Sequence, residues 1–87
     1  MHAVVVHVTV NDRDTAIETL RGTIVPRISG LPGFVGGYWV ALGADKGTSI
    51  AAFDSEEQAQ EAAEQVSARG AEVTVDSVEV GEVVGNA

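Results

Sequence analysis

The stretch FVGGYWVALGADKGTSIAAF, residues 34–53, contains two runs of aromatic and β-branched residues separated by a turn sequence. The runs cover residues 34–42 and 48–53, and the five residues between them, GADKG, are typical of a turn. The stretch therefore predicts a β-hairpin. Gly36 and Gly37 interrupt its first arm, which indicates a bulge or a place where another group approaches the backbone closely.

One strand and one helix are predicted before the hairpin. Residues 3–10 are almost entirely β-branched, which favours a strand. Apolar residues then recur at helical spacing from Ile17 to Ile28, and they predict a helix over about residues 12–28. Pro26 lies inside this helix, and because proline lacks the amide hydrogen we expect a bend or an early stop there.

A second helix and a last strand are predicted after the hairpin. Ser55 and Gln58 have the spacing of a capping box, and a narrow stripe of alanines follows them up to a stop at Gly70. The last strand is expected to begin at about Ala71. Its valines change parity at residues 76–77, which indicates a bulge or a break in that strand.

The order strand, helix, strand, strand, helix, strand is that of a ferredoxin-like α+β domain, which has both helices on one face of an antiparallel sheet. With 87 residues the chain allows one such domain, spanning residues 1–87. The first three strands are apolar on both parities, so the face without helices needs a cover. The economical cover is the same face of a second copy, and we therefore expect a homodimer.

Composition excludes several classes of site and partner. The chain has 5 Lys and Arg against 13 Asp and Glu, a formal net charge of −8, which argues against nucleic acid and anionic membranes as partners. Most of the acidic residues lie in residues 54–82, and we interpret them as a solvated face. Because there is no cysteine and only two histidines, no thiolate chemistry and no metal site are expected. Without a basic leader or a long apolar run, the expected location is cytoplasmic.

Three segments carry a resemblance to a known family: the helix tail IVPRI at residues 24–28, the turn and strand LPGFVGG at residues 31–37, and the strand exit AFDSEE at residues 52–57. Together they resemble the antibiotic biosynthesis monooxygenase-like group of the dimeric α+β barrel superfamily. The resemblance covers nearly the whole chain and implies that two sheets pair into such a barrel. The group includes cofactor-free oxygenases of aromatic polyketides as well as haem-degrading enzymes and isomerases, and no cofactor is expected here.

Two positions depart from the enzymes of that group. The haem-degrading and polyketide-oxidising members usually have a tryptophan at the position of Phe53. They also have a polar amide on the first strand, where this chain has Val4, Val6 and Val8. Their catalytic residues are therefore not transferred to this chain, and the resemblance implies a fold more specifically than an activity.

Five residues are candidates for ligand binding. Tyr38 and Trp39 are neighbours on a strand and point to opposite faces, so at most one of them lines a given cavity. One of the two, with Phe53, is predicted to wall a pocket between sheet and helices for a flat apolar molecule, although core or interface packing explains the same aromatics. His7 is a candidate general base or an interface histidine. Arg27 either meets an anionic ligand or lies exposed near the end of its helix.

Two classes of function follow from these residues. The first is a monooxygenase-like pocket protein that binds or oxidises a small aromatic, polyketide-like compound. The second is a non-catalytic dimeric module with a ligand-binding or structural role. A cavity with convergent polar groups favours the first class, and a space filled by side chains favours the second.

Overall fold

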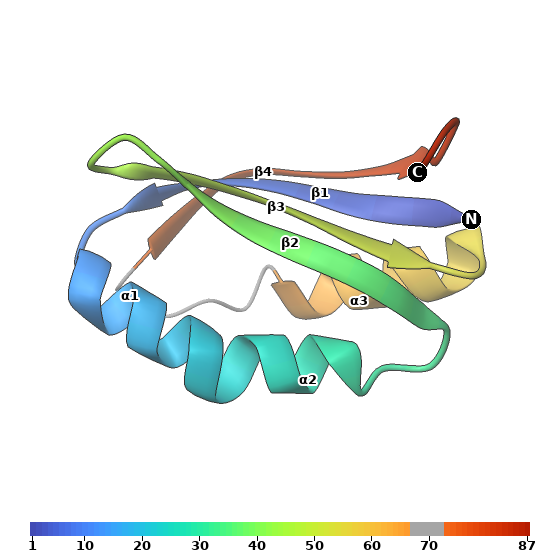
Figure 1. Cartoon of the computed structure of the whole chain (residues 1–87), viewed down its shortest axis with the longest axis horizontal. Coiled ribbons are helices and arrows are strands. Elements are labelled where there is room, and N and C mark those ends of the chain that lie inside the picture. The colour runs from blue at the N-terminus through green and yellow to red at the C-terminus, as the bar shows by residue number, and fades with distance from the viewer. Residues whose placement is uncertain (67–72) are drawn as a thin grey trace.

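The computed structural model describes residues 1–66 and 73–87, and its elements follow the predicted order (Figure 1). The strands are β1 (His2–Val10), β2 (Phe34–Leu42), β3 (Lys46–Phe53) and β4 (Val73–Glu82). The helices are α1 (Arg13–Thr19), α2 (Val25–Ser29) and α3 (Glu56–Val66), and a π-helical segment, η1 (Leu20–Ile24), connects the first two. The predicted helix stop at Gly70 and strand start at Ala71 lie outside the described residues.

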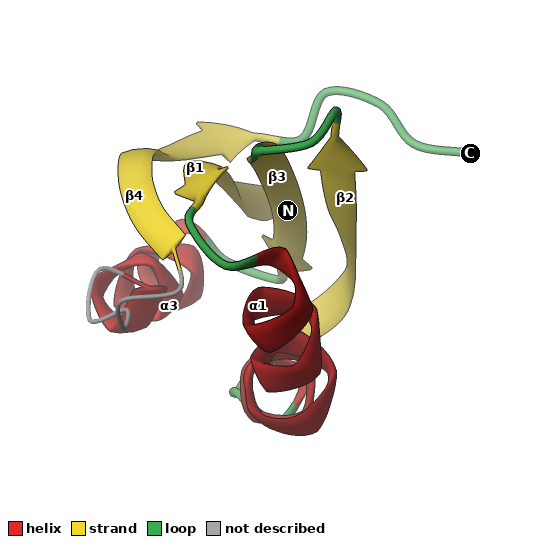
Figure 2. Ribbon diagram, turned by 90° about the vertical axis from the view of Figure 1, so that its left-hand side faces the viewer, coloured by secondary structure: helices red, strands yellow, loops and turns green. Residues whose placement is uncertain are grey.

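The four strands form one antiparallel sheet in the order β2-β3-β1-β4. All helices lie on one face of this sheet, as Figures 1 and 2 show from two directions. The ferredoxin-like α+β prediction is therefore confirmed. No helix among the described residues is long and apolar enough to cross a membrane.

Both irregularities predicted within the strands are present. The pairing of β2 with β3 shifts between Phe34 and Gly36, which makes the strand bulge directly before the glycine pair. On β4 the register shifts opposite residues 7 and 8 of β1, where Asp76 is the extra residue. The second shift restores a common face for the valines before and after it, which is why their parity changes in the sequence.

The sheet has one face toward the helices and one open face. Val4 and Val6 of β1 point toward the helices and are buried, and the register places Ser49 of β3 beside Val6. Val5 and His7 have the opposite parity and lie on the open face.

The closed part of the core lies beneath α3. Phe53 is fully buried there, with its ring edge-on to Phe34 at a centroid distance of 5.8 Å. Ala59 and Ala62 of α3 are buried against the same cluster. The hydroxyl of Ser55 accepts a hydrogen bond from the amide of Gln58 at 3.2 Å, so the predicted serine cap of this helix is present.

The first helical stretch differs from the single helix predicted for residues 12–28. Asp12 caps it and accepts a hydrogen bond from the amide of Thr15, but regular α-helix ends at Thr19. In η1 the amide of Val25 donates to the carbonyl of Leu20, five residues back. We attribute this widened turn to Pro26, whose ring presses on the carbonyl four residues before it. The irregularity therefore precedes the proline instead of lying at it.

Candidate functional site

A cavity of about 310 Å³ lies between the sheet and the stretch formed by α1 and η1. Strands β1, β2 and β3 supply its floor, and the two helical segments supply its other wall. Its apolar lining residues include Val6, Val8, Ile17, Leu20, Ile24 and Trp39. In this half of the molecule, the space between sheet and helices is therefore not filled by side chains. A filled space was the feature expected of the structural module.

The cavity arises from how Trp39 lies on the sheet. A Cβ atom added to Gly37 would come within 3.2 Å of the Trp39 ring, so the indole leans over the glycine backbone. The next row of the sheet contains Ala41, Gly47, Val8 and Val75, and the first three line the cavity. Both predicted features are thus present, a bulge directly before Gly36 and a close approach at Gly37.

Ser49 supplies a polar group on the cavity floor. The residue is only 9% exposed and lies beside Val6 and Trp39 in the register of the sheet. Its hydroxyl has no hydrogen-bond partner within residues 1–66 and 73–87. Its Oγ atom is accessible from the cavity, so a ligand there can accept or donate a hydrogen bond.

Two arginines of the first helical stretch border the cavity. Nη1 of Arg13 donates to the carbonyl of Gly43 in the β2–β3 turn at 3.3 Å. Arg21 lies in η1, is exposed, and has no hydrogen bond or ion pair within the described part of the chain. Lys46 also contributes to the lining, but its ammonium is bonded elsewhere.

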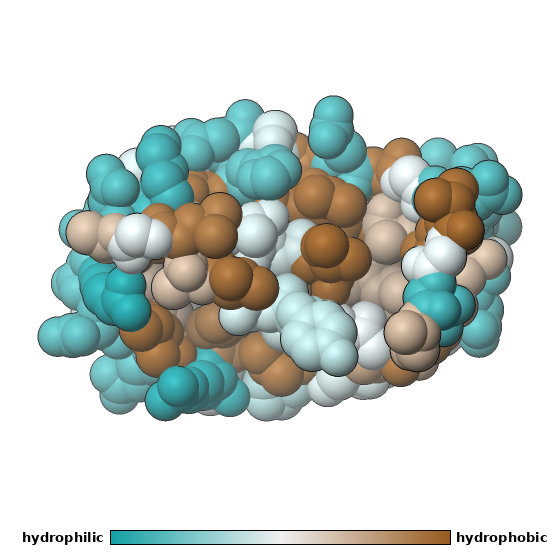
Figure 3. Space-filling model, turned by 45° about the horizontal axis from the view of Figure 1, so that its top comes forward, coloured by the Kyte–Doolittle hydropathy of each residue, from teal (hydrophilic) through white to brown (hydrophobic). Residues whose placement is uncertain are grey.

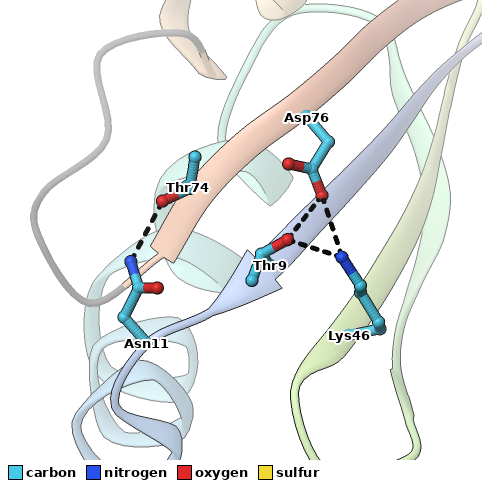
Figure 4. Close-up of polar contacts among 5 residues, drawn as sticks. All are labelled: Thr9, Asn11, Lys46, Thr74 and Asp76. Carbon is cyan, nitrogen blue, oxygen red and sulfur yellow. Dashed lines mark hydrogen bonds and ion pairs between the residues drawn. The ribbon is translucent and has the colours of Figure 1, made fainter.

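The ammonium of Lys46 lies among polar groups on the open face of the sheet (Figure 4). It donates to the hydroxyl of Thr9 at 2.8 Å and lies 3.9 Å from a carboxylate oxygen of Asp76. The same Thr9 hydroxyl donates to Asp76 at 2.8 Å, and Asn11 donates to Thr74 nearby at 3.0 Å. This polar group occupies the end of the open face from which β1 leads into α1.

Figure 3 shows that the rest of this open face is largely apolar. Tyr38 is 78% exposed there, and Ile50 is 49% exposed beside it in the register. Val40 and Leu42 are also exposed. A contiguous exposed apolar area of this kind is typical of an interaction surface.

The five candidate residues named from the sequence do not come together. Trp39 lines the cavity, whereas Tyr38 and His7 lie on the open face, so the two neighbouring aromatics are separated by the sheet. Phe53 lies in the closed part of the core and lines a smaller gap of about 10 Å³. Arg27 is exposed on α2 and is not among the cavity residues.

Sequence reasoning missed Ser49, Arg13 and Arg21. A signal for Ser49 was present, because it is the polar residue on a strand parity that otherwise contains glycine, alanine and phenylalanine. The arginines gave no such signal, since their direction depends on the π-helical segment that follows α1 and contains Arg21. The residue spacing of a regular α-helix does not predict the direction of these side chains.

The described residues contain no group of three or more His, Cys, Asp or Glu side chains placed to hold a metal ion. No histidine or carboxylate among them lines the cavity either. The arrangement offers an aromatic wall, the hydroxyl of Ser49, two threonine side chains and two guanidinium groups. These groups bind and orient a molecule.

Comparison with known proteins gives a fold. No model of a protein family matches the chain, and no curated protein sequence does. Two solved structures are similar over the whole chain. HapK from Hahella chejuensis has a TM-score of 0.73 and 14% identity, with 100% of this chain and 96% of HapK covered.

The second is a mutant of MhuD, solved with two manganese protoporphyrin IX molecules per active site. It has a TM-score of 0.70 and 18% identity, with 100% of this chain and 98% of MhuD covered. The fold implied by the resemblance to the antibiotic biosynthesis monooxygenase-like group is thus confirmed: this chain shares, along its whole length, the α+β fold of HapK and MhuD.

Proposed function

We propose that this protein binds a small, flat and largely apolar molecule in the cavity between its sheet and the α1–η1 stretch. The observation that carries the proposal is the unpartnered hydroxyl of Ser49 beside the Trp39 indole on the floor of a 310 Å³ cavity. Ligand sites are typically concave and apolar with a few polar groups that fix orientation. The indole supplies a stacking wall and the hydroxyl supplies the orienting hydrogen bond.

The size of the cavity restricts the ligand. Sites for drug-sized molecules measure roughly 300–1,000 Å³, and this cavity is at the lower end of that range. MhuD, which shares the fold, binds a planar ring system in its active site, and this supports a planar ligand here. We expect an aromatic molecule of one to three rings, of polyketide-like type, and not a porphyrin.

Oxidation of the bound molecule is a second candidate function. The resemblance to the antibiotic biosynthesis monooxygenase-like group, whose members include cofactor-free oxygenases, supports it. The cavity lining described above lacks a histidine or carboxylate to remove a proton, so binding is proposed before catalysis. Oxygen consumption in the presence of each compound that binds distinguishes the two.

The binding proposal is tested by the fluorescence of Trp39, the only tryptophan in the chain. Titration with one- to three-ring aromatic compounds, flavin and haem should shift or quench the emission for members of the first set. Thr19→Leu, which adds bulk inside the cavity, should weaken this binding about tenfold or more. Thr23→Leu is the matched control, because Thr23 is exposed on the same stretch and does not line the cavity.

A flat titration against every compound would leave the alternative function, a structural module without a ligand. Equal weakening by Thr19→Leu and Thr23→Leu would place any binding outside the cavity. A response to haem and flavin alone would contradict the proposed ligand size.

We also propose that the protein is a homodimer paired through the open face of the sheet. The support is the exposed apolar area around Tyr38 and Ile50, which a second copy covers by presenting the same area. Such an interface should bury more than roughly 1,000 Å² in total. His7 would then lie within the interface. This agrees with its interpretation from the sequence as an interface histidine.

Light scattering at micromolar concentration tests the dimer. Ile50→Glu should give the monomer mass, because it would place an unpaired charge in the interface. Thr74→Glu, on the polar end of the same face, should leave the dimer intact. A monomer mass for the unmodified protein would end this proposal.

A further inference from the structure

On the α1–η1 stretch, basic side chains line the cavity and acidic side chains do not. Arg13 and Arg21 line the cavity, whereas Asp14 and Glu18, which lie between them in the sequence, do not. No carboxylate among the described residues lines it. In a chain with 13 acidic and 5 basic residues, a cavity bordered by guanidinium groups and by no described carboxylate departs from the average surface.

Helix stability does not explain the two arginines. Arg13 lies in the first turn of α1, where the helix dipole opposes a cation. Its Nη1 is used in the hydrogen bond to Gly43, and its remaining donors are left for a ligand. Arg21 has no partner within the described residues, so its full set of donors faces solvent and the cavity opening.

We propose that the molecule bound in this cavity carries a carboxylate on its apolar ring system, and that Arg21, assisted by Arg13, binds that group. The proposal rests on the proposed function, since it names the class of ligand for the same cavity. A guanidinium fork matches a carboxylate with two parallel hydrogen bonds. The ligand class is therefore aromatic carboxylic acids of one to three rings.

The position of each group within the cavity fits such a ligand. Trp39 and Ser49 lie on the sheet floor, where the ring system is removed from water. Arg21 is exposed, so the carboxylate lies toward the opening and keeps part of its hydration. The chain's net charge of −8 repels anions in general, and the arginines provide the local exception.

A matched pair of ligands isolates the charge. 2-Naphthoate and methyl 2-naphthoate share one ring system and differ in the ionised group. Trp39 fluorescence is titrated with both, at low salt and at 0.5 M salt. The acid should bind the unmodified protein about tenfold more tightly than the ester at low salt, and this preference should shrink at high salt.

A matched pair of variants isolates the residue. Arg21→Gln should weaken binding of the acid about tenfold and leave binding of the ester within about twofold. Arg27→Gln makes the same change at an exposed position outside the cavity, and it should alter neither. Arg21→Lys keeps the charge without the fork and should retain part of the preference.

Each outcome bears on one of the two proposals. Equal binding of acid and ester by the unmodified protein overturns the carboxylate proposal and leaves the ligand cavity standing. Equal weakening by Arg21→Gln and Arg27→Gln overturns it too, because the preference would then follow overall charge. Failure of both naphthalene compounds and of every other aromatic compound to bind overturns the proposed function itself.

Discussion

The helix layer has a closed half beneath α3 and an open half beneath α1 and η1. In the closed half Ala59, Ala62 and Val66 are buried against a core that includes Phe53. In the open half no residue of α1 or η1 is buried, although Ile17, Leu20 and Ile24 are bulkier than the three buried residues of α3. Bulk on a helix therefore does not by itself close a layer.

The difference lies in what each helix meets on the sheet. Small side chains on α3 let its backbone approach β1, β3 and β4, and the large ring of Phe53 fills the space between them. Large side chains on α1 and η1 face the row of Ala41 and Gly47, and they hold the helix backbone away from the sheet. Small helix side chains over a large ring close one half, whereas large helix side chains over small residues leave the other half open.

The largest expected effect tests the closed half directly. Phe53→Ala should lower the free energy of unfolding by about 3–5 kcal/mol, because it removes a fully buried ring from a tightly packed cluster. Leu20→Ala in the open half should cost about 1 kcal/mol, since that side chain already lacks contacts on its cavity side. Urea denaturation measures both, and equal losses would contradict the difference between the halves.

The next effect comes from adding bulk to the helices in place of removing it. Ala62→Leu should destabilise the protein by about 1–3 kcal/mol, because the gap beside Ala62 measures only about 10 Å³ and does not hold the larger side chain. Ala16→Leu makes the identical change on α1, where the side chain lines the cavity, and should cost nothing or add stability. Thermal unfolding measures both variants, and an equal loss of stability would contradict the difference between the closed and open halves.

A smaller effect is expected at Gly37, where the Trp39 ring leans away from the open half. An added Cβ would lie 3.0 Å from the backbone carbonyl of Ile50 and 3.2 Å from the ring. The carbonyl cannot move freely, so Gly37→Ala should cost about 1–2 kcal/mol and shift the Trp39 emission. Gly36→Ala is the control, because nothing lies within 4 Å of its added Cβ.

The smallest effect tests whether the open half unfolds locally, without unfolding of the closed half. Asp12→Ala removes the N-cap of α1 and should cost about 1 kcal/mol or less. Because α1 buries no side chain, the faster amide hydrogen exchange should be confined to residues 13–19. Ser55→Ala at the cap of α3 should instead raise exchange through the closed core, and the same spread from both variants would argue against separate halves.

Features with a local cause were predictable from the sequence. The hairpin, the bulge at the glycine pair and the register shift at Asp76 each follow from residue types and parity within a few positions. The open apolar face followed in the same way, from strands that are apolar on both parities.

The cavity was only partly predictable, because it depends on relations between elements. The alternation of strand residues separates Tyr38 from Trp39 but does not say which faces the helices. Phe53 was predicted to wall the pocket together with one of these aromatics, and packing with α3 places it in the closed half. The directions of Arg13 and Arg21 depend on a helical turn that a regular period does not describe.

The π-helical turn also makes the cavity lining sensitive to chain length within the helix. A π-turn holds one more residue than an α-helical turn, so it amounts to a single-residue insertion that is absorbed without breaking the helix. Deleting Gly22, whose Cβ position touches nothing, would let the stretch become regular and rotate everything before it by about 100° relative to α2. Ile17 and Arg13 would then turn away from the sheet while α2 kept its place. The helical phase of α1 is thus set by one residue, and in related chains a one-residue gap at this point would exchange one set of cavity side chains for another.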